Sequence, residues 1–272
     1  MKNLTDDEFE RIRSFIKQKL GINLSDEKKS LIHSRLGSTL HEKGFDNFTQ
    51  YFDSLLQDKT EQALIQFVDK VTTNHTYFMR ETDHFDYFRD TVLPYIYEKH
   101  SQSNDLRLWC AGCSSGEESY TLQILIQDFF KNKPDKWNTE ILATDISTTV
   151  LKKAVRGVYP IDSLKNMPKQ WVNEYFETFD KEHKQVREEI KKLITYRKYN
   201  LMEEKFPFKK PLQTIFCRNV MIYFDFATRE QLVKKFYDAT ITGGYLFIGH
   251  SESLHNTDTQ YKYIKPAVYR KV

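Results

Sequence analysis

Short apolar segments alternate with helical patterns from about residue 105 onward, and this alternation restricts the possible folds more than any other feature. The apolar segments read LRLWCA, EILATD, LQTIFC and GYLFIGH, and helical patterns at 116–130, 147–154 and 226–240 separate them. Strands that are apolar along their whole length are typical of a parallel sheet with helices on both faces. The sequence therefore predicts an α/β fold for this part of the chain.

Ligands of such sheets bind beyond the carboxyl ends of the strands. The residues to follow come directly after each apolar segment: Gly112 to Glu118, Asp145, Arg218 to Tyr223, and His250 to Glu252. We expect a ligand site where the first three of these segments meet. We interpret the last one, a His-Ser-Glu sequence, as a turn at a strand end.

Residues 1–75 carry the pattern of amphipathic helices instead. Thr5 and Glu8 form a capping-box sequence, and Gly21 supplies a stop after a series of apolar residues at helical spacing. We predict an all-α domain over residues 1–75, a linker with a helix over 76–104, and the α/β domain over 105–272. Between about 157 and 198 a charged stretch and the β-like run LITYRKY interrupt the alternation, which predicts a small inserted β-subdomain.

The composition excludes several classes of protein. The 272 residues are 39% hydrophobic with a formal net charge of +3, too small a charge to indicate a nucleic-acid binder. No apolar run approaches the ~18 residues that a membrane span requires. The acidic, polar N-terminus is unlike a leader peptide, and three cysteines fit a reducing compartment. We therefore expect a cytoplasmic monomer without membrane insertion.

The segment LWCAGCSSGEESYTL allows two interpretations. Cys110 and Cys113 form a Cys-x-x-Cys behind a tryptophan, as in thiol–disulfide oxidoreductases. However, two glutamates follow closely, and their negative charge would raise the thiol pKa and disfavour the reactive thiolate. Thiol–disulfide exchange is the less favoured alternative.

The other interpretation is a glycine loop that holds a nucleoside-like ligand. Gly112 and Gly116 stand where a strand gives way to a helix, and Asp145 ends the next strand, where nucleotide-binding sheets hold ribose hydroxyls. Asp145 at this point is also compatible with a helix N-cap. No Walker sequence is present, and acidic residues argue against a pyrophosphate. S-adenosylmethionine, which has a ribose, a positive charge and no phosphate, fits best. The eight histidines form no pair at i, i+4 spacing, so we predict no metal site.

Several segments together are similar to the CheR-type chemotaxis receptor methyltransferases: TTNHTYFMRE, AGCSSGEESYTL, ATDIS, FCRNVMIYFD and LFIGHSESL. The resemblance runs over nearly the whole chain. It implies a Rossmann-like, S-adenosylmethionine-dependent methyltransferase sheet behind an all-α domain. It also implies methyl transfer to glutamate side chains on the cytoplasmic helical bundle of chemoreceptors, with S-adenosylhomocysteine as the product.

The resemblance also implies a set of site residues. Arg80 and Tyr223 would lie nearest the transferred methyl group. The cofactor would be bound by Asn74, Thr76, Arg80, Gly112, Glu118, Asp145, Asn200, Leu201, Arg218 and Asn219. Taken singly, an Arg80–Glu81 sequence is more typical of a surface ion pair than of a site, and Tyr223 is equally compatible with core packing.

This assignment is chemically consistent. A glutamate of pKa ~4.3 is already ionised at neutral pH, so the acceptor needs no general base. Methyl transfer neutralises the carboxylate and the sulfonium together, so the site mainly has to orient and desolvate them. An alternative without chemistry is a signalling module that binds S-adenosylmethionine and does not turn it over.

The chain departs from the family pattern at three places. The segment YFETFDKEHKQVREEIKK of the inserted block contains no glycine. Many relatives grip a receptor C-terminal tether there through a glycine-containing turn, so we expect weak or absent tether binding. The helix expected to face the acidic receptor carries four basic residues against three acidic ones, listed here: Lys28, Lys29, Arg35 and Lys43 against Asp26, Glu27 and Glu42. Cys110 and Cys113 stand where relatives often have alanine or serine.

Overall fold

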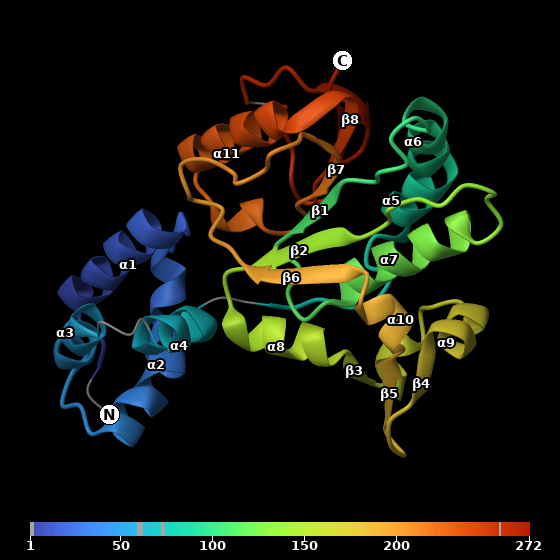
Figure 1. Cartoon of the computed structure of the whole chain (residues 1–272). Coiled ribbons are helices and arrows are strands. Elements are labelled where there is room, and N and C mark those ends of the chain that lie inside the picture. The colour runs from blue at the N-terminus through green and yellow to red at the C-terminus, as the bar shows by residue number, and fades with distance from the viewer. Residues whose placement is uncertain (1–2, 59–61, 72–73, 256) are drawn as a thin grey trace.

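A computed structural model describes residues 3–58, 62–71, 74–255 and 257–272. The chain begins with a small helical domain, at the left of Figure 1. Its elements are α1 (Asp6–Leu20), η1 (Asp26–Lys28), α2 (Lys29–Lys43), α3 (Phe48–Gln57) and α4 (Gln62–Val71). The predicted capping box is confirmed, because the Glu8 backbone N–H donates to the Thr5 hydroxyl while the Thr5 N–H donates to the Glu8 carboxylate. Gly21, at φ 71°, ends α1 in the left-handed conformation that favours glycine.

The α/β part forms a seven-stranded sheet in the order β6-β2-β1-β7-β8-β10-β9. Its strands are β1 (Leu108–Ala111), β2 (Ile141–Asp145), β6 (Ile194–Lys198), β7 (Leu212–Phe216), β8 (Thr240–Phe247), β9 (Lys262–Lys265) and β10 (Val268–Arg270). The first five in spatial order pair in parallel, and β10 runs antiparallel to both β8 and β9. The predicted α/β class with a largely parallel sheet is therefore confirmed.

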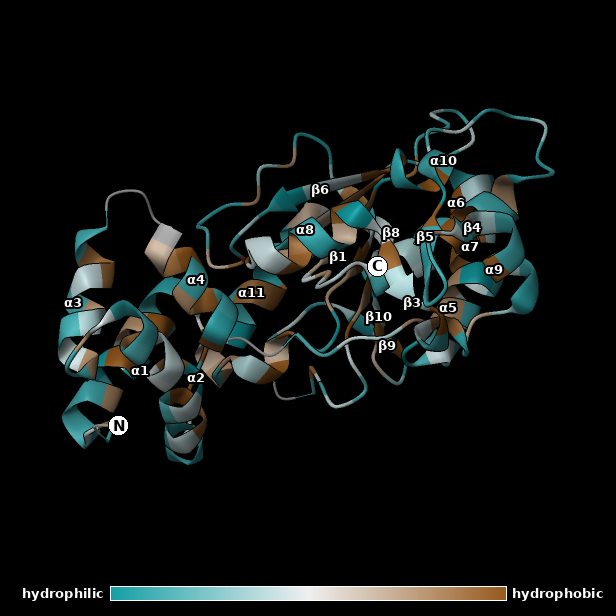
Figure 2. Ribbon diagram, turned by 90° about the horizontal axis from the view of Figure 1, so that it is seen from below, coloured by the Kyte–Doolittle hydropathy of each residue, from teal (hydrophilic) through white to brown (hydrophobic). Residues whose placement is uncertain are grey.

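Helices cover both faces of this sheet (Figures 1 and 2). They are α5 (Thr82–Tyr87), η2 (Phe88–Val92), α6 (Leu93–Lys99), α7 (Glu117–Phe130), α8 (Thr148–Arg156) and α11 (Phe226–Ala239). Side chains of β1 alternate between two cores: Leu108 and Cys110 pack with α5, η2, α6 and α7, whereas Trp109 and Ala111 pack with α11. A strand buried on both faces reads as continuously apolar, which is why its sequence predicted a parallel sheet.

The inserted block forms a second, three-stranded antiparallel sheet in the order β3-β5-β4. Its elements are β3 (Val158–Pro160), η3 (Ile161–Leu164), α9 (Lys169–Tyr175), β4 (Phe176–Thr178), β5 (His183–Val186) and α10 (Glu188–Lys191). The predicted extent of the insertion, 157–198, is too long at its C-terminal end, because residues 194–198 are β6 and pair with β2 in the main sheet. β6 lies at the edge of that sheet and ends in the exposed Arg197 and Lys198, so its composition resembled that of the charged insertion.

The helical domain docks against the α/β part beside the carboxyl ends of β1 and β2. Ile22, in the segment after α1, forms an antiparallel bridge with Phe224, and the Asn23 N–H donates to the Tyr223 carbonyl over 2.7 Å. The three-stranded sheet lies at the opposite end of the molecule (Figure 2). Over the residues that the structure describes, no helix is long and apolar enough to cross a membrane.

Candidate functional site

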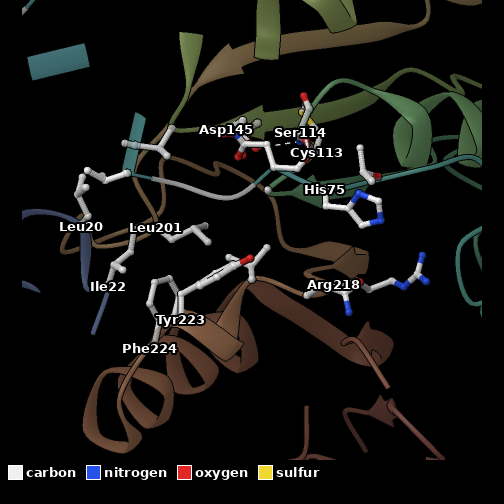
Figure 3. Close-up of a pocket in the computed structure, with 18 of the residues that line it drawn as sticks. Leu20, Ile22, His75, Cys113, Ser114, Asp145, Leu201, Arg218, Tyr223 and Phe224 are labelled. Carbon is white, nitrogen blue, oxygen red and sulfur yellow. Dashed lines mark hydrogen bonds between the residues drawn. The ribbon is translucent and has the colours of Figure 1, made fainter. Parts of the chain in front are cut away.

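One cavity opens where the carboxyl ends of β1, β2 and β7 face the helical domain. Its empty volume, open mouth included, is about 1380 Å³. The structure brings all of the predicted site residues to its lining: Asn74, Thr76, Arg80, Gly112, Glu118, Asp145, Asn200, Leu201, Arg218, Asn219 and Tyr223. Figure 3 shows Asp145 and Ser114 on one side of the cavity, facing Tyr223 and Phe224 on the other.

The loop between β1 and α7 approaches the cavity with its backbone. Gly112 and Gly116 have φ angles of 84° and 101°, which favour glycine. A Cβ atom on Gly112 would lie 2.5 Å from a Val220 methyl carbon. The N–H groups of Gly112 and Cys113 both donate to the Thr144 carbonyl, at 2.8 and 2.9 Å, which fixes the loop to the end of β2.

Asp145 ends β2 and shapes the same loop. One carboxylate oxygen accepts the Ser114 N–H at 2.8 Å and the other accepts the Ser147 N–H at 2.9 Å. Burial raises the pKa of this carboxyl, while the backbone N–H groups oppose that rise. The N-cap of α8 is Ser147, whose hydroxyl accepts the Val150 N–H, so the alternative of an Asp145 N-cap is wrong. Asp145 therefore lines the cavity as a buried acceptor.

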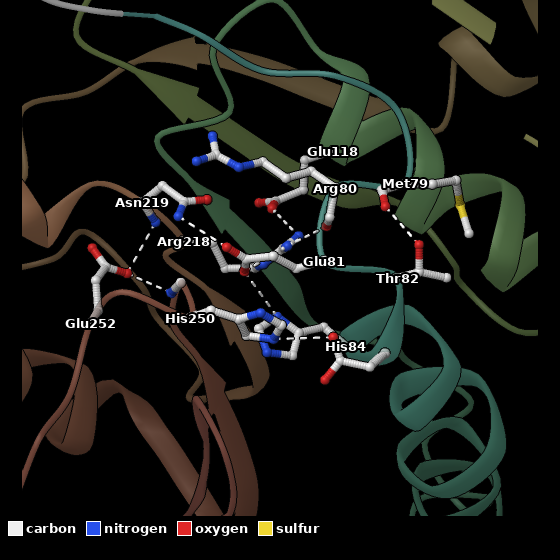
Figure 4. Close-up of polar contacts among 12 residues, drawn as sticks. Met79, Arg80, Glu81, Thr82, His84, Glu118, Arg218, Asn219, His250 and Glu252 are labelled. Carbon is white, nitrogen blue, oxygen red and sulfur yellow. Dashed lines mark hydrogen bonds and ion pairs between the residues drawn. The ribbon is translucent and has the colours of Figure 1, made fainter. Parts of the chain in front are cut away.

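Arg218 lies at the centre of an ion-pair network beside the cavity (Figure 4). Its side chain is 1% exposed, with Nη1 2.7 Å from the Glu118 carboxylate and Nη2 3.0 Å from that of Glu81. Nη2 also donates to the Arg80 carbonyl. Burial raises the pKa of the Glu81 carboxyl, but Arg218 and the Asn219 amide outweigh it and hold the pKa below its usual value. Arg218 thus joins three chain segments at the cavity wall.

Arg80 and Tyr223 line the same cavity from different segments. The Arg80 Nη1 donates to the His75 carbonyl at 2.9 Å, and its guanidinium lies 5.9 Å from the centre of the Tyr77 ring. Tyr223 is half-buried, and burial raises its pKa while the positive charges of Arg80 and Arg35 oppose the rise. Its hydroxyl is therefore protonated at neutral pH.

Two carboxylates beside the cavity were not assigned to the site from the sequence. Glu81 was considered only as the surface partner of Arg80, yet it binds Arg218 and accepts the Asn219 Nδ2 at 3.1 Å. Glu252 accepts the backbone N–H groups of Asn219 and Ile222, at 3.0 and 3.1 Å, and so holds the segment that carries Tyr223. Its place directly after β8, among the residues at strand ends, was the available signal. A positive φ at Glu81 (57°) and Asn219 (58°) shows how tightly this region is constrained.

The two cysteines of the loop are buried, and the structure shows no disulfide for them. Burial raises the pKa of both thiols well above its usual value, and nearby carboxylates, Glu118 at Cys110 and Asp145 at Cys113, raise it further. The Cys110 thiol donates to the Glu118 carboxylate over 3.2 Å. These thiols lack the exposure and the low pKa of a redox dithiol, so the geometry does not favour thiol–disulfide exchange.

The basic residues of α2 mostly contact the helical domain itself. Lys29 pairs with Asp6 at 2.5 Å, and Arg35 donates to the carbonyls of Lys70 and Val71, each at 3.3 Å. Lys28 lines the cavity. Of these residues, Lys29 has its charge balanced by a carboxylate of the same domain.

Comparisons with known proteins agree over almost the whole chain. Residues 74–270 match the family model "CheR methyltransferase, SAM binding domain", and residues 7–72 match "CheR methyltransferase, all-alpha domain". A chemotaxis protein methyltransferase of Borreliella burgdorferi is 45% identical over 99% of this chain and 95% of its own length. One from Salmonella typhimurium is 34% identical over 98% of this chain and 90% of its own.

Likeness to solved structures is more remote. An N-methyltransferase of Bradyrhizobium japonicum in complex with S-adenosylhomocysteine shares 11% identity, covering 59% of this chain and 60% of its own, with a TM-score of 0.31. This likeness is too low to bear on the arrangement of the site.

Proposed function

Because the chain belongs to the CheR methyltransferase family, which depends on S-adenosylmethionine, we propose that it transfers methyl groups from this donor to glutamate side chains of chemoreceptors. These glutamates would lie on the cytoplasmic helical bundle of the receptors. The products would be glutamate methyl esters and S-adenosylhomocysteine. The observation that carries the proposal is that segments far apart in the sequence, from Asn74 to Tyr223, meet around a single cavity beside the strand ends.

The residues around the cavity fit the cofactor. S-adenosylmethionine, when bound, supplies an electrophilic methyl group on a positively charged sulfur. The carboxylates of Glu118 and Asp145 offer acceptors for its ammonium and hydroxyl groups, and the backbone of the glycine loop lines the cavity at Gly112. Leu201 offers an apolar surface, and Asn200 offers polar groups beside it. Together with Tyr199 they form a part of the lining that suits an adenine ring. These roles are part of the proposal.

Arg80 and Tyr223 would act on the acceptor. The substrate carboxylate is ionised at neutral pH, since an unperturbed glutamate has a pKa of ~4.3, so no base is required. The Arg80 guanidinium would hold one carboxylate oxygen, and the protonated Tyr223 hydroxyl would direct the other along the path to the methyl carbon. Moderate rather than strong charge stabilisation suits this reaction, because both charges disappear as the new bond forms.

A methyl-transfer assay tests this function. Purified protein, labelled S-adenosylmethionine and receptor cytoplasmic fragments should give label in base-labile esters of glutamate. The Arg80→Ala variant should lose transfer while its fold is retained. If the wild type binds S-adenosylhomocysteine in calorimetry but transfers no label to any receptor fragment, the alternative of a binding module without turnover is favoured instead.

The Tyr223→Phe variant isolates the hydroxyl. We expect kcat to fall on the order of 100-fold, because misorientation of reacting groups has effects of this size, while affinity for S-adenosylhomocysteine stays within about twofold. Tyr263→Phe is the matched control, since Tyr263 is 51% exposed and lies outside the cavity lining. Unchanged kcat in Tyr223→Phe would remove this hydroxyl from the mechanism.

We further propose that the protein acts in the cytoplasm as a monomer and binds receptor C-terminal tethers weakly or not at all. The β4–β5 turn forms without glycine: the Asp180 carboxylate accepts the N–H groups of Glu182 and His183, each at 2.8 Å. A complex of micromolar or better affinity with an isolated receptor C-terminal peptide would refute the proposal on tether binding.

A further inference from the structure

Two histidines and a glutamate converge on the outer side of the Arg218 network. Glu81, His84 and His250 each place a potential metal-ligating atom within 4.8 Å of the others. Glu81 and His84 stand at the start of α5, and His250 follows β8. The His84 Nδ1 lies 3.5 Å from the Glu81 Oε2, and the two imidazole rings lie 4.6 Å apart at 83° (Figure 4).

The hydrogen bonding of the buried His84 side chain is incomplete among the described residues. It is 0% exposed, and within the described part of the chain neither of its ring nitrogens has a hydrogen-bond partner. Buried polar groups in proteins almost always have a partner, so an imidazole in this state needs an explanation. The unprotonated nitrogen of a neutral imidazole has a lone pair that can bind a ligand.

We propose that Glu81, His84 and His250 form a binding site for a divalent transition metal ion of the Zn²⁺ class. Two imidazole nitrogens and a carboxylate oxygen are the donor set that such ions favour. In a tetrahedral site with bonds of roughly 2.0–2.1 Å, neighbouring ligand atoms are about 3.4 Å apart. The His84–Glu81 contact already has this spacing, and the exposed His250 has room to close the rest.

Asp83 completes the open side of the site. Its carboxylate lies 3.0 Å from the His250 Nε2, and both side chains are 45% exposed, which gives an ion a path from solvent. A carboxylate in contact with a ligating histidine orients the ring and strengthens metal binding. The sequence did not reveal the site, because its histidines stand on α5 and after β8 rather than one helical turn apart.

The charges around the site are closely balanced before an ion binds. Glu81 and Asp83 belong to the site and pair with Arg218 and Lys265, and Glu118 takes up a further share of the Arg218 charge. Glu81 already accepts hydrogen bonds from Arg218 and Asn219, but its two oxygens together offer about four lone-pair positions. One lone pair therefore remains for the ion.

Metal titration of the full chain tests the proposal without any assay of catalysis. Protein without a polyhistidine tag, stripped with a chelator, is titrated with Zn²⁺ in a calorimeter and with Co²⁺ in a spectrophotometer. We expect one ion per chain and the visible absorption of a four-coordinate Co²⁺ with nitrogen and oxygen ligands. His250→Ala should weaken affinity at least tenfold, and Asp83→Asn about tenfold, as loss of an orienting partner does.

His255→Ala is the matched control. This exposed histidine lies a few residues beyond His250 and outside the cluster, so its loss should leave metal affinity unchanged. Circular dichroism of each variant establishes that it is folded. The proposal is overturned if the wild type shows no saturable binding below millimolar Zn²⁺, or if His250→Ala binds the ion as tightly as the wild type. Thiolate-to-metal charge-transfer bands would likewise overturn it, since they would place the ion on cysteine.

Discussion

The charge of Arg218 is shared between two carboxylates that come from different parts of the chain, Glu81 before α5 and Glu118 in α7. Such a buried network is costly to break, because removing one partner leaves the others desolvated and only partly compensated. Its main effect is to set the relative positions of the segments that carry Arg80 and Asn219. The network therefore connects the segments that form this wall of the cavity.

Glu118→Gln tests that network at the scale of one side chain. The variant keeps the volume but loses the charge that faces Arg218, so we expect the free energy of unfolding to fall by about 2 kcal/mol. Urea denaturation at pH 7 measures the change. Glu98→Gln is the control: Glu98 is 72% exposed and pairs with its neighbour Lys99, so the change should stay within about 0.5 kcal/mol. Equal stability of the two variants would contradict the role given to the network.

Single residues were predictable where a strand end exposed them. Asp145 ends β2 and Glu118 lies in the first turn of the helix after β1, so the rule for parallel sheets located both at the carboxyl ends of strands. Glu81 and His84 were not predictable in this way, because their partners lie far along the chain. Spacing within one segment carries no information about a contact that only the tertiary fold creates.

Two glycines at helix ends, Gly116 in the β1–α7 loop and Gly44 after α2, differ in the space that surrounds them. A Cβ on Gly116 would lie 2.8 Å from the Tyr159 hydroxyl and 2.9 Å from the Ala154 Cβ. At Gly44, the C-cap of α2, the φ angle is 74° and a Cβ would meet nothing within 4 Å. The two positions share the left-handed conformation but differ in the space around it.

Gly116→Ala and Gly44→Ala separate strain from crowding. Each variant bears the cost of a left-handed alanine, about 1 kcal/mol. Gly116→Ala should lose a further 1–3 kcal/mol, roughly the cost of overpacking, because α7 has to move away from α8. Thermal or urea unfolding gives both values. A Gly116→Ala variant as stable as Gly44→Ala would show that the loop tolerates displacement.

Elements with strong local signals were predicted better than those at an edge. The capping box and Gly21 define α1 within the sequence, and the buried strand β1 is apolar throughout. β6 was assigned to the insertion because an edge strand is half-exposed and its charged residues resemble a surface hairpin. Which sheet a strand joins is decided by tertiary pairing, here with β2, and the segment itself does not encode it.

At the scale of the molecule, the two domains meet through backbone and charge. Asp225 is the N-cap of α11 and also pairs with Lys17 of α1 at 2.8 Å. The hydrogen bonds from Lys17 and Thr228 lower the pKa of Asp225 from 3.8 to about 2. A carboxyl whose folded-state pKa is depressed stabilises the fold above its unfolded pKa, and this contribution is lost as the pH falls through the folded value.

Asp225→Asn removes the charge and keeps a side chain that caps helices well. The wild type should therefore be more stable than this variant at pH 6, and the difference should shrink as the pH falls from about 4 towards 2. Urea denaturation at several pH values measures it. Lys17→Met is the complementary variant, and in its background the effect of Asp225→Asn should be smaller. A difference that does not vary with pH would exclude the ion pair as its source.

The strand bridge between Ile22 and Phe224 makes the helical domain part of the cavity, since Leu20, Ile22 and Tyr223 line it together. Occupancy of the cavity and attachment of the helical domain are therefore thermodynamically linked: a molecule bound between them favours the docked arrangement. By reciprocity, a partner that binds the helical domain and shifts its docking also changes the affinity of the cavity for its ligand. Such a partner would thus raise or lower the affinity for the methyl donor without contacting the donor itself.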